Sequence, residues 1–275
     1  MARLGKMEND EFIEMTNEQK EHINFMAEIA KSVSDTPMVL KGGTALLLAY
    51  GLDRFSEDLD FDSTKSLNME YKIRNSAKRA KVKIGRIFVK KDTGTTKRYM
   101  VNYVGNQSRR SLKIETSFRE KEIDSDETTI INGIRVYKLN VLISQKLDAG
   151  LNRAKVRDLY DINYLSKNYG HMFSAENIRK LADFASEPDA LISRYQQDHN
   201  DDDILRNSSL DDLALKVNLN YENLSQDRVT VTRLAEKFSQ DKFNSTEDRE
   251  RFVSSVNAQV ENIKEEAKQE QDLER

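Results

Sequence analysis

The chain has 275 residues, of which 33% are charged and 37% hydrophobic, so it can form one large domain or two ordinary ones. It has no cysteine and three histidines. This excludes disulfide scaffolds, thiolate zinc sites, iron–sulfur clusters and cysteine nucleophiles, so any metal must be held by oxygen ligands. No apolar run approaches the roughly 18 residues of a membrane span, and the N-terminus lacks the apolar core of a signal peptide. We therefore expect a cytoplasmic protein with no membrane partner.

The formal net charge of −3 conceals three blocks of different sign. Residues 1–64 hold 6 Lys and Arg against 13 Asp and Glu, residues 65–121 hold 17 against 4, and residues 122–275 hold 21 against 30. The middle block, called here the basic island, carries a net +13 and favours a polyanionic partner such as nucleic acid. Charge alone leaves open a solvated lysine-rich face that offsets the acidic flanks.

The first predicted element is a helix. Thr16 and Gln19 form a capping-box pattern, and the apolar residues after them repeat at helical spacing to about Val33. Pro37 then ends the helical pattern.

The next segment combines a glycine turn with alternating acids. A short buried strand leads into Gly42 and Gly43, and a short apolar helix follows and ends at Gly51. The sequence SEDLDFD then alternates acidic and apolar residues, which predicts a strand with Asp58 and Asp60 on one face.

A basic helix is expected over residues 68–81, followed by strand-like stretches, the last of which contains the hairpin signal Asn132-Gly133. Only helical patterns follow from about residue 140. We therefore predict an α+β chain with a mixed-sheet domain over residues 1–139 and a helical domain over residues 140–275. The last ~15 residues are so polar that we expect a solvent-facing helix or a frayed tail.

The glycine turn and the paired acids suit phosphate chemistry together. Backbone N–H groups at Gly42 and Gly43, and the Thr44 hydroxyl, can approach phosphate oxygens at a helix N-terminus. Two carboxylates at i and i+2 of a strand, here Asp58 and Asp60, can hold hard divalent cations. The alternatives are a tight strand-to-helix turn for the glycines and a charged edge strand that opposes aggregation for the acids.

At this point the chain resembles a known family. Gly-Gly-Thr, a short helix and Asp-x-Asp resemble the nucleotidyltransferase superfamily that includes DNA polymerase β. The fuller form, GGTALLLAYGLDRFSEDLDF, is similar to the AbiEii/MenT group of bacterial toxins. SLKIETSFRE, with Lys113 and Glu115, and LISQKLDAGLNRAKVRDLYDINYL, with Lys146 and Asp158, match later motifs of that group. The resemblance spans about residues 39–165 and implies a polymerase-β-like N-terminal domain, with the helical domain completing a cleft.

The resemblance also implies an activity. It indicates a Mg²⁺-dependent transferase that adds a nucleotide from a nucleoside triphosphate to RNA, with the tRNA 3′ end as expected acceptor, causing growth arrest or abortive infection. An AbiEi-like antitoxin encoded nearby is the implied partner, without a stable complex. The alternatives are an antibiotic-type transferase that acts on a small molecule, and a catalytically inactive module that binds nucleotide or RNA.

Site roles follow from the same resemblance. Asp58 and Asp60 would hold two Mg²⁺, with Glu115 as a further ligand or a base for the attacking hydroxyl. Lys146 would neutralise phosphate charge, and Asp158 would be the essential acid of the last motif. The residues expected to contact the triphosphate are Gly42, Gly43, Thr44, Arg54 and Lys113.

Three of these positions have plainer interpretations. Arg54 could pair locally with Glu57 or Asp58 instead of reaching phosphate. Lys146 could extend to solvent from the edge of an apolar helix seam. On the helix that carries Asp158, the neighbouring residues Arg157 and Asp161 have the spacing of an ordinary surface ion pair.

Overall fold

The computed structural model describes residues 15–106, 109–185, 187–242 and 245–256. It divides into two compact units between Lys138 and Leu139, one residue before the boundary expected from the sequence. Within the described ranges, no helix combines the length and apolar character that a membrane span requires.

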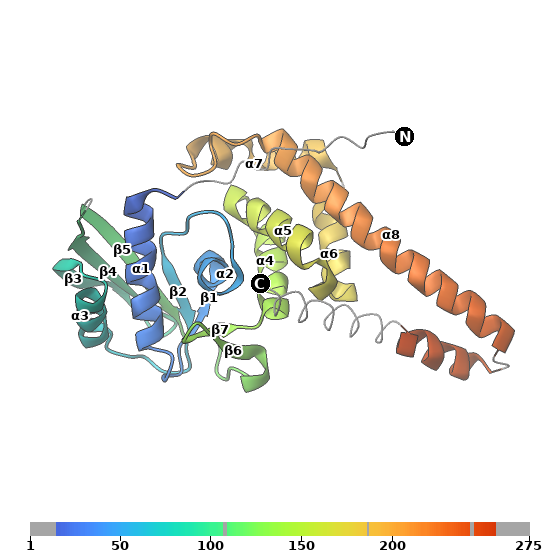
Figure 1. Cartoon of the computed structure of the whole chain (residues 1–275), viewed down its shortest axis with the longest axis horizontal. Helices are drawn as coiled ribbons and strands as arrows, with labels where there is room; N and C mark the ends of the chain where they lie inside the picture. The colour runs from blue at the N-terminus through green and yellow to red at the C-terminus, as the bar shows by residue number, and fades with distance from the viewer. Residues whose placement is uncertain (1–14, 107–108, 186, 243–244, 257–275) are drawn as a thin grey trace, which may run out of the picture. The chain divides into compact units, whose positions relative to one another are not determined.

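The first unit is built on a mixed sheet whose seven described strands follow the order β3-β4-β5-β2-β1-β7-β6 (Figure 1). The strands are β1 (Val39–Lys41), β2 (Leu59–Asp62), β3 (Lys83–Asp92), β4 (Thr96–Val104), β5 (Arg109–Ser117), β6 (Thr128–Ile131) and β7 (Ile134–Tyr137). The helices are α1 (Asn17–Ser32), α2 (Gly42–Tyr50) and α3 (Glu70–Arg79), with a 3₁₀ turn at Ser125–Glu127. The mixed-sheet prediction is confirmed.

The start of α1 confirms the predicted capping box. The Thr16 hydroxyl accepts a hydrogen bond from the Gln19 backbone N–H at 3.2 Å, and the Gln19 side chain accepts one from the Thr16 N–H at 2.9 Å. Farther along α1, Phe25 packs edge-on against Tyr103 of β4, with ring centroids 4.9 Å apart. Since α3 packs on β3, α1 and α3 cover one face of the outer strands (Figure 1).

The predicted turns are also confirmed. Gly51 ends α2 in the left-handed conformation, with φ of 70°. Asn132 and Gly133 connect β6 to β7 with φ of 52° and 76°. Positive φ at both central residues is what a tight hairpin turn of this kind requires.

The centre of the sheet sets which side chains share a face. β2 runs antiparallel to β1 and parallel to β5, so Asp60 has Lys41 opposite it on one side and Glu115 on the other. Leu59 and Phe61 are buried. Because side chains alternate along a strand, the acids of β2 project from the face opposite those two apolar residues.

The second unit is helical in its described residues, as predicted. Its helices are α4 (Leu139–Asn152), α5 (Val156–Tyr169), α6 (Ala175–Ala185), α7 (Pro188–Asp201) and α8 (Leu210–Lys242), with a 3₁₀ turn at Gly170–Met172. Side chains of α7 form hydrogen bonds with backbone groups where α4 ends and α5 begins. Asp198 accepts from the Val156 N–H at 2.8 Å, and Arg194 donates to the Leu151 carbonyl at 2.8 Å.

Candidate active site

Four of the residues singled out from the sequence meet on one face of the central sheet. Asp60 on β2 and Glu115 on β5 are register partners in a parallel pair. The Lys113 ammonium donates to Asp58 Oδ2 at 2.6 Å. Arg98 of β4, which is the register partner of Glu115, pairs with its carboxylate at 2.5 Å. The structure thus adds Arg98, which the sequence reasoning missed because only strand pairing brings it opposite Glu115.

The electrostatics of this face favour a bound cation. Burial raises the pKa of Asp60 above its ordinary value, and the carboxylates of Asp58 and Glu115 raise it further against the opposing charge of Lys113. Burial alone would lower the pKa of Lys113, but its hydrogen bond to Asp58 and the charges of the three acids raise it. Asp58 and Glu115 are paired with Lys113 and Arg98, whereas Asp60 has no ion-pair partner among the described residues, and a positive ion there would relieve its repulsion from the other two acids.

The N-terminus of α2 lies beside these acids. Gly42 has φ of +74°, and a Cβ built there would lie 3.6 Å from Asp60 Oδ2. A Cβ on Gly43 would lie 2.9 Å from the Arg54 guanidinium. Gly42 is therefore required by its left-handed backbone, and a side chain at Gly43 would have to displace the Arg54 guanidinium.

Thr44 and Arg54 are buried beneath this turn. The Thr44 hydroxyl donates to the backbone carbonyl of Asp58 and shares a hydrogen bond of 2.7 Å with Ser56. Arg54 is 2% exposed and donates to the Phe55 carbonyl at 3.0 Å. Thr44 therefore ties α2 to the strand that carries the acids, and phosphate contact by either side chain stays a prediction.

Asp62, the second acid of β2, has other partners. Its carboxylate receives a hydrogen bond from the Lys41 ammonium at 2.5 Å and another from the Tyr137 hydroxyl at 3.1 Å. Burial and the charge of Asp62 raise the pKa of Tyr137. Because Asp62 has these partners of its own, we do not include it with Asp58 and Asp60 as a metal ligand.

The donor set fits magnesium. In the described part of the chain, no three carboxylate or imidazole groups converge as a ready metal cage. Mg²⁺ needs no such cage, since it is commonly held by one or two carboxylates together with waters and substrate phosphates. Asp58 and Asp60 supply that pair from one strand face, and Asp58 would exchange its contact with Lys113 for the ion.

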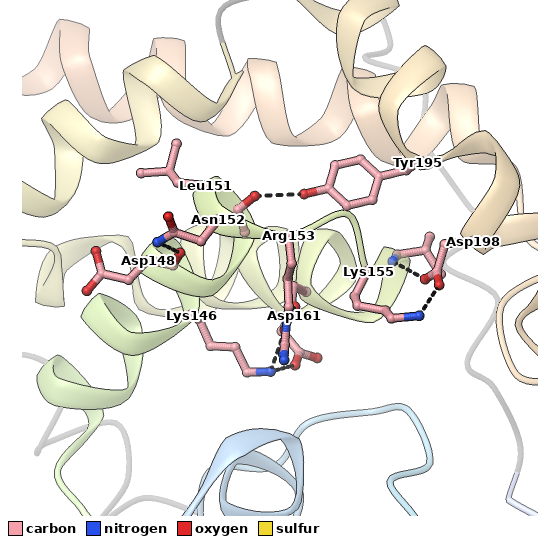
Figure 2. Close-up of polar contacts among 12 residues, drawn as sticks. Lys146, Asp148, Leu151, Asn152, Arg153, Lys155, Asp161, Tyr195 and Asp198 are labelled. Atoms are coloured by element: carbon pink, nitrogen blue, oxygen red, sulfur yellow. Dashed lines mark hydrogen bonds and ion pairs between the residues drawn. The ribbon is translucent and has the colours of Figure 1, made fainter. Parts of the chain in front are cut away.

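Lys146 and Asp158, the two predicted catalytic residues of the second unit, form one ion network there. The Lys146 ammonium lies 3.0 Å from Asp158 Oδ1. It also lies 2.6 Å from Asp161 Oδ2, the contact with a labelled partner in Figure 2. Arg153 donates to both oxygens of Asp158, at 2.7 and 3.1 Å. Asp161 and Arg153 were not among the predicted site residues.

Burial decides how this network is interpreted. The Lys146, Asp158 and Asp161 side chains are 10%, 2% and 0% exposed, so Lys146 does not extend to solvent and Asp161 is not a surface residue. Burial would raise the pKa of Asp158, but the charges and hydrogen bonds of Lys146 and Arg153 lower it below its ordinary value. The ammonium is thus held between two carboxylates of its own unit, and its action on phosphate stays a prediction.

Arg157, the other charged residue of that motif, pairs with α7. Its guanidinium lies 2.6 Å from Asp202. Asp202 also accepts the backbone N–H groups of Ile204 and Leu205 at 2.9 Å each. Arg157 therefore contributes to holding α5 near the end of α7.

Comparisons with known proteins show the family of this chain. Residues 24–266 match the family model described as nucleotidyl transferase AbiEii toxin, type IV TA system. A crystal structure of a proposed nucleotidyltransferase from H. pylori is similar, with 35% identity, a TM-score of 0.71, and coverage of 78% of this chain and 97% of that one. The crystal structure of JHP933 from Helicobacter pylori gives 34% identity, a TM-score of 0.71, and coverage of 80% and 99%. A comparison with curated protein sequences finds no significant match.

Proposed function

Because this chain belongs to the AbiEii family of nucleotidyltransferase toxins, we propose that it transfers a nucleotide from a nucleoside triphosphate to RNA, with the 3′ end of tRNA as acceptor. The transfer would take place in the cytoplasm and arrest growth or abort phage infection. An AbiEi-like antitoxin would counteract it without forming a stable complex.

The observation that carries the proposal is the acidic face beside the α2 N-terminus. Asp58 and Asp60 project beside a helix start whose Gly42 backbone lies close to the Asp60 carboxylate. A triphosphate bound there would meet backbone N–H groups on one side and the carboxylate pair on the other. Two Mg²⁺ bound at such a pair neutralise charge that develops on the attacking and leaving oxygens.

The chain's own residues supply the positioning. In the reaction, an RNA hydroxyl attacks the α-phosphate, the bond from the α-phosphorus to the bridging oxygen breaks, and pyrophosphate leaves. Asp58 and Asp60 hold Mg²⁺, and Gly42, Gly43 and the Lys113 ammonium contact the triphosphate. Glu115 is a further metal ligand or takes the proton of the attacking hydroxyl.

The basic island supports a polyanionic acceptor. Its net +13 over residues 65–121 is more than a neutral antibiotic-like acceptor needs, and it suits the phosphates of RNA. In the second unit, we propose that Lys146 neutralises phosphate charge and that Asp158, which pairs with Lys146, is the essential acid of the last motif.

The experiment supplies the purified chain with total tRNA, Mg²⁺ and each of the four nucleoside triphosphates labelled at the α-phosphate. The control is the double variant Asp58→Ala, Asp60→Ala. We expect label in tRNA with the unchanged chain and one or more nucleotides, and none with the variant.

Other outcomes would assign other functions. Label that appears only when an aminoglycoside replaces tRNA in the reaction would favour the antibiotic-type transferase. Binding of triphosphate with no labelled product from any acceptor would favour an inactive binding module. Either result would contradict transfer to tRNA.

A further inference from the structure

The sheet face that carries the acids of the candidate active site continues across β5, β4 and β3, where its exposed charged side chains are basic. Side chains on one face of β3, β4 and β5 line up in rows across the sheet, and one of these rows reaches Asp60 of β2. Three rows are Arg86–Asn102–Ser111, Phe88–Met100–Lys113 and Lys91–Arg98–Glu115, the last of which continues to Asp60. We define the outer sheet face by its six residues beyond the acids: Lys83, Arg86, Phe88, Met100, Asn102 and Arg109.

This face is open and its cations are unopposed. Lys83, Arg86, Asn102 and Arg109 are exposed, and Phe88 and Met100 are partly exposed. Among the described residues, no carboxylate forms an ion pair with Lys83, Arg86 or Arg109. The positive charge here is therefore free to meet an anionic partner.

The aromatic ring of Phe88 lies among these basic side chains. The Arg86 guanidinium carbon lies 4.9 Å from the centroid of the Phe88 ring. An aromatic ring and a guanidinium plane are the groups on which unstacked bases pack in single-stranded nucleic acid complexes, and nearby cations contact the phosphates. Base pairs in a duplex keep their faces stacked on each other and cannot use such a platform.

The rest of the basic island is arranged differently. On α3, which covers the opposite face, Lys72, Arg74 and Arg79 pair with the carboxylates of Asp35, Glu70 and Glu28. Lys72 and Arg79 also line a groove of about 460 Å³ between α1 and α3. Because these cations already have partners, α3 is the weaker candidate for binding a polyanion.

We propose that the outer sheet face binds the single-stranded end of the acceptor RNA, with a base stacked on Phe88 and Arg86 and with Lys83 and Arg109 on its phosphates. The inference rests on the proposed function for the identity of the acceptor. Adjacent strands lie ~4.8 Å apart, so Phe88 on β3 is about 14 Å across the sheet from β2. The platform therefore holds the acceptor upstream of the reacting end and does not touch the triphosphate.

The test measures binding without any nucleotide, so that it does not depend on transfer. Fluorescence anisotropy follows the full chain binding a single-stranded RNA of about twelve nucleotides, and a blunt RNA duplex of the same length serves as comparison. The variants are Arg86→Glu and Phe88→Leu, which keeps an apolar side chain but removes the ring. Arg74→Glu on α3 is the matched charge control, and circular dichroism confirms that each variant is folded.

We expect Phe88→Leu to weaken single-strand binding by at least about fivefold, the lower end for loss of one stacked base. Arg86→Glu should weaken it by about tenfold, because the guanidinium that stacks with the base is replaced by a carboxylate that repels the strand. Arg74→Glu should change it by less than about twofold, within the range of a charge remote from the bound strand.

If Arg86→Glu and Arg74→Glu lowered the affinity for single-stranded RNA equally, the proposal would be overturned, because the basic island would then bind RNA only through its total charge. Unchanged binding by Phe88→Leu, or a duplex bound as tightly as the single strand, would also overturn it. A separate assay of label transfer to tRNA, with Asp60→Asn as its inactive control, distinguishes failure of the RNA-binding proposal from failure of the proposed function. If RNA binding behaves as expected while neither Asp60→Asn nor the unchanged chain labels tRNA, the surface stands and the transferase proposal fails.

Discussion

Two residues at the start of α2 determine how the carboxylates are held. Gly42 adopts φ of +74° close to Asp60, and the Thr44 hydroxyl holds the Asp58 carbonyl. The sequence predicted that glycine was needed at the turn, since the strand-to-helix reversal has few other solutions. It assigned the Thr44 hydroxyl to phosphate and missed its buried partner, because no local pattern shows that residues 44 and 58 are adjacent.

The first prediction concerns the backbone at Gly42. Gly42→Ala should destabilise the first unit by about 1–2 kcal/mol, since an alanine pays this cost in the left-handed conformation. Gly94→Ala is the control, because a Cβ there meets no atom within 4 Å and its φ is not in the left-handed region. Urea unfolding followed by circular dichroism measures both. Equal stability of Gly42→Ala and the unchanged chain would contradict the left-handed assignment.

The second prediction concerns the hydroxyl of Thr44. Thr44→Val keeps the shape of the side chain but leaves the Asp58 carbonyl without its donor. Loss of such a bond costs about 1–3 kcal/mol, so we expect nucleotide transfer to fall by about 5-fold or more. Thr44→Ser keeps the hydroxyl and should stay within about threefold of the unchanged chain by the same measure. If the valine and serine variants transferred label equally, the hydroxyl would have no part in placing Asp58.

Within the helical unit, one buried ion network joins neighbouring elements. Lys146 of α4 contacts Asp158 and Asp161 of α5, and Arg153 closes on Asp158 from the connection between these helices. Both helices were predictable from their apolar periodicity. The network was not, because the residues belong to two helices and their contacts depend on how those helices pack.

The third prediction follows from the charge of Asp158. Its pKa lies below the ordinary value of 3.8 in the folded chain, so the ionised carboxylate stabilises the fold above that value and the contribution is lost as pH falls through the lower folded pKa. Asp158→Asn should therefore cost about 1.5–3 kcal/mol at pH 7, the range for hydrogen bonds to charged groups. The gap from the unchanged chain should close in acid well below pH 3.8.

Urea unfolding at neutral and acidic pH, followed by helical ellipticity, measures this gap. Asp212→Asn is the control, because that carboxylate is 59% exposed and its pair with Lys216 lies along a single helix. We expect the control to change stability by less than about 0.5 kcal/mol. A gap for Asp158→Asn that stayed constant with pH would show that the loss comes from packing and not from charge.

At the scale of the whole molecule, the type and order of the secondary-structure elements could be predicted from the sequence, whereas the pairing of strands in the sheet could not. The glycine turn, the alternating acids, the hairpin and the change to helical periods are local patterns, and they predicted a mixed sheet followed by helices. The order of strands is not local. Arg98 lies opposite Glu115 because of the register between β4 and β5. Arg86 and Phe88 share a face because they lie two residues apart on β3, but the open sheet face that they belong to depends on the pairing of β3 with β4 and β5. The division of the basic island into a paired face and an open face was therefore visible only in the fold.

The most direct test of the central claim measures kcat/KM for transfer of labelled nucleotide to tRNA by the unchanged chain and by Asp60→Asn. The substitution keeps the size of the side chain and removes the charge that would hold Mg²⁺. Asp35→Asn, at a position with a 79% exposed side chain on the other side of the sheet, is the control. We predict that Asp60→Asn lowers kcat/KM by at least about 100-fold and that Asp35→Asn leaves it unchanged. A value for Asp60→Asn close to that of the unchanged chain would contradict the assignment of the acidic face as the active site.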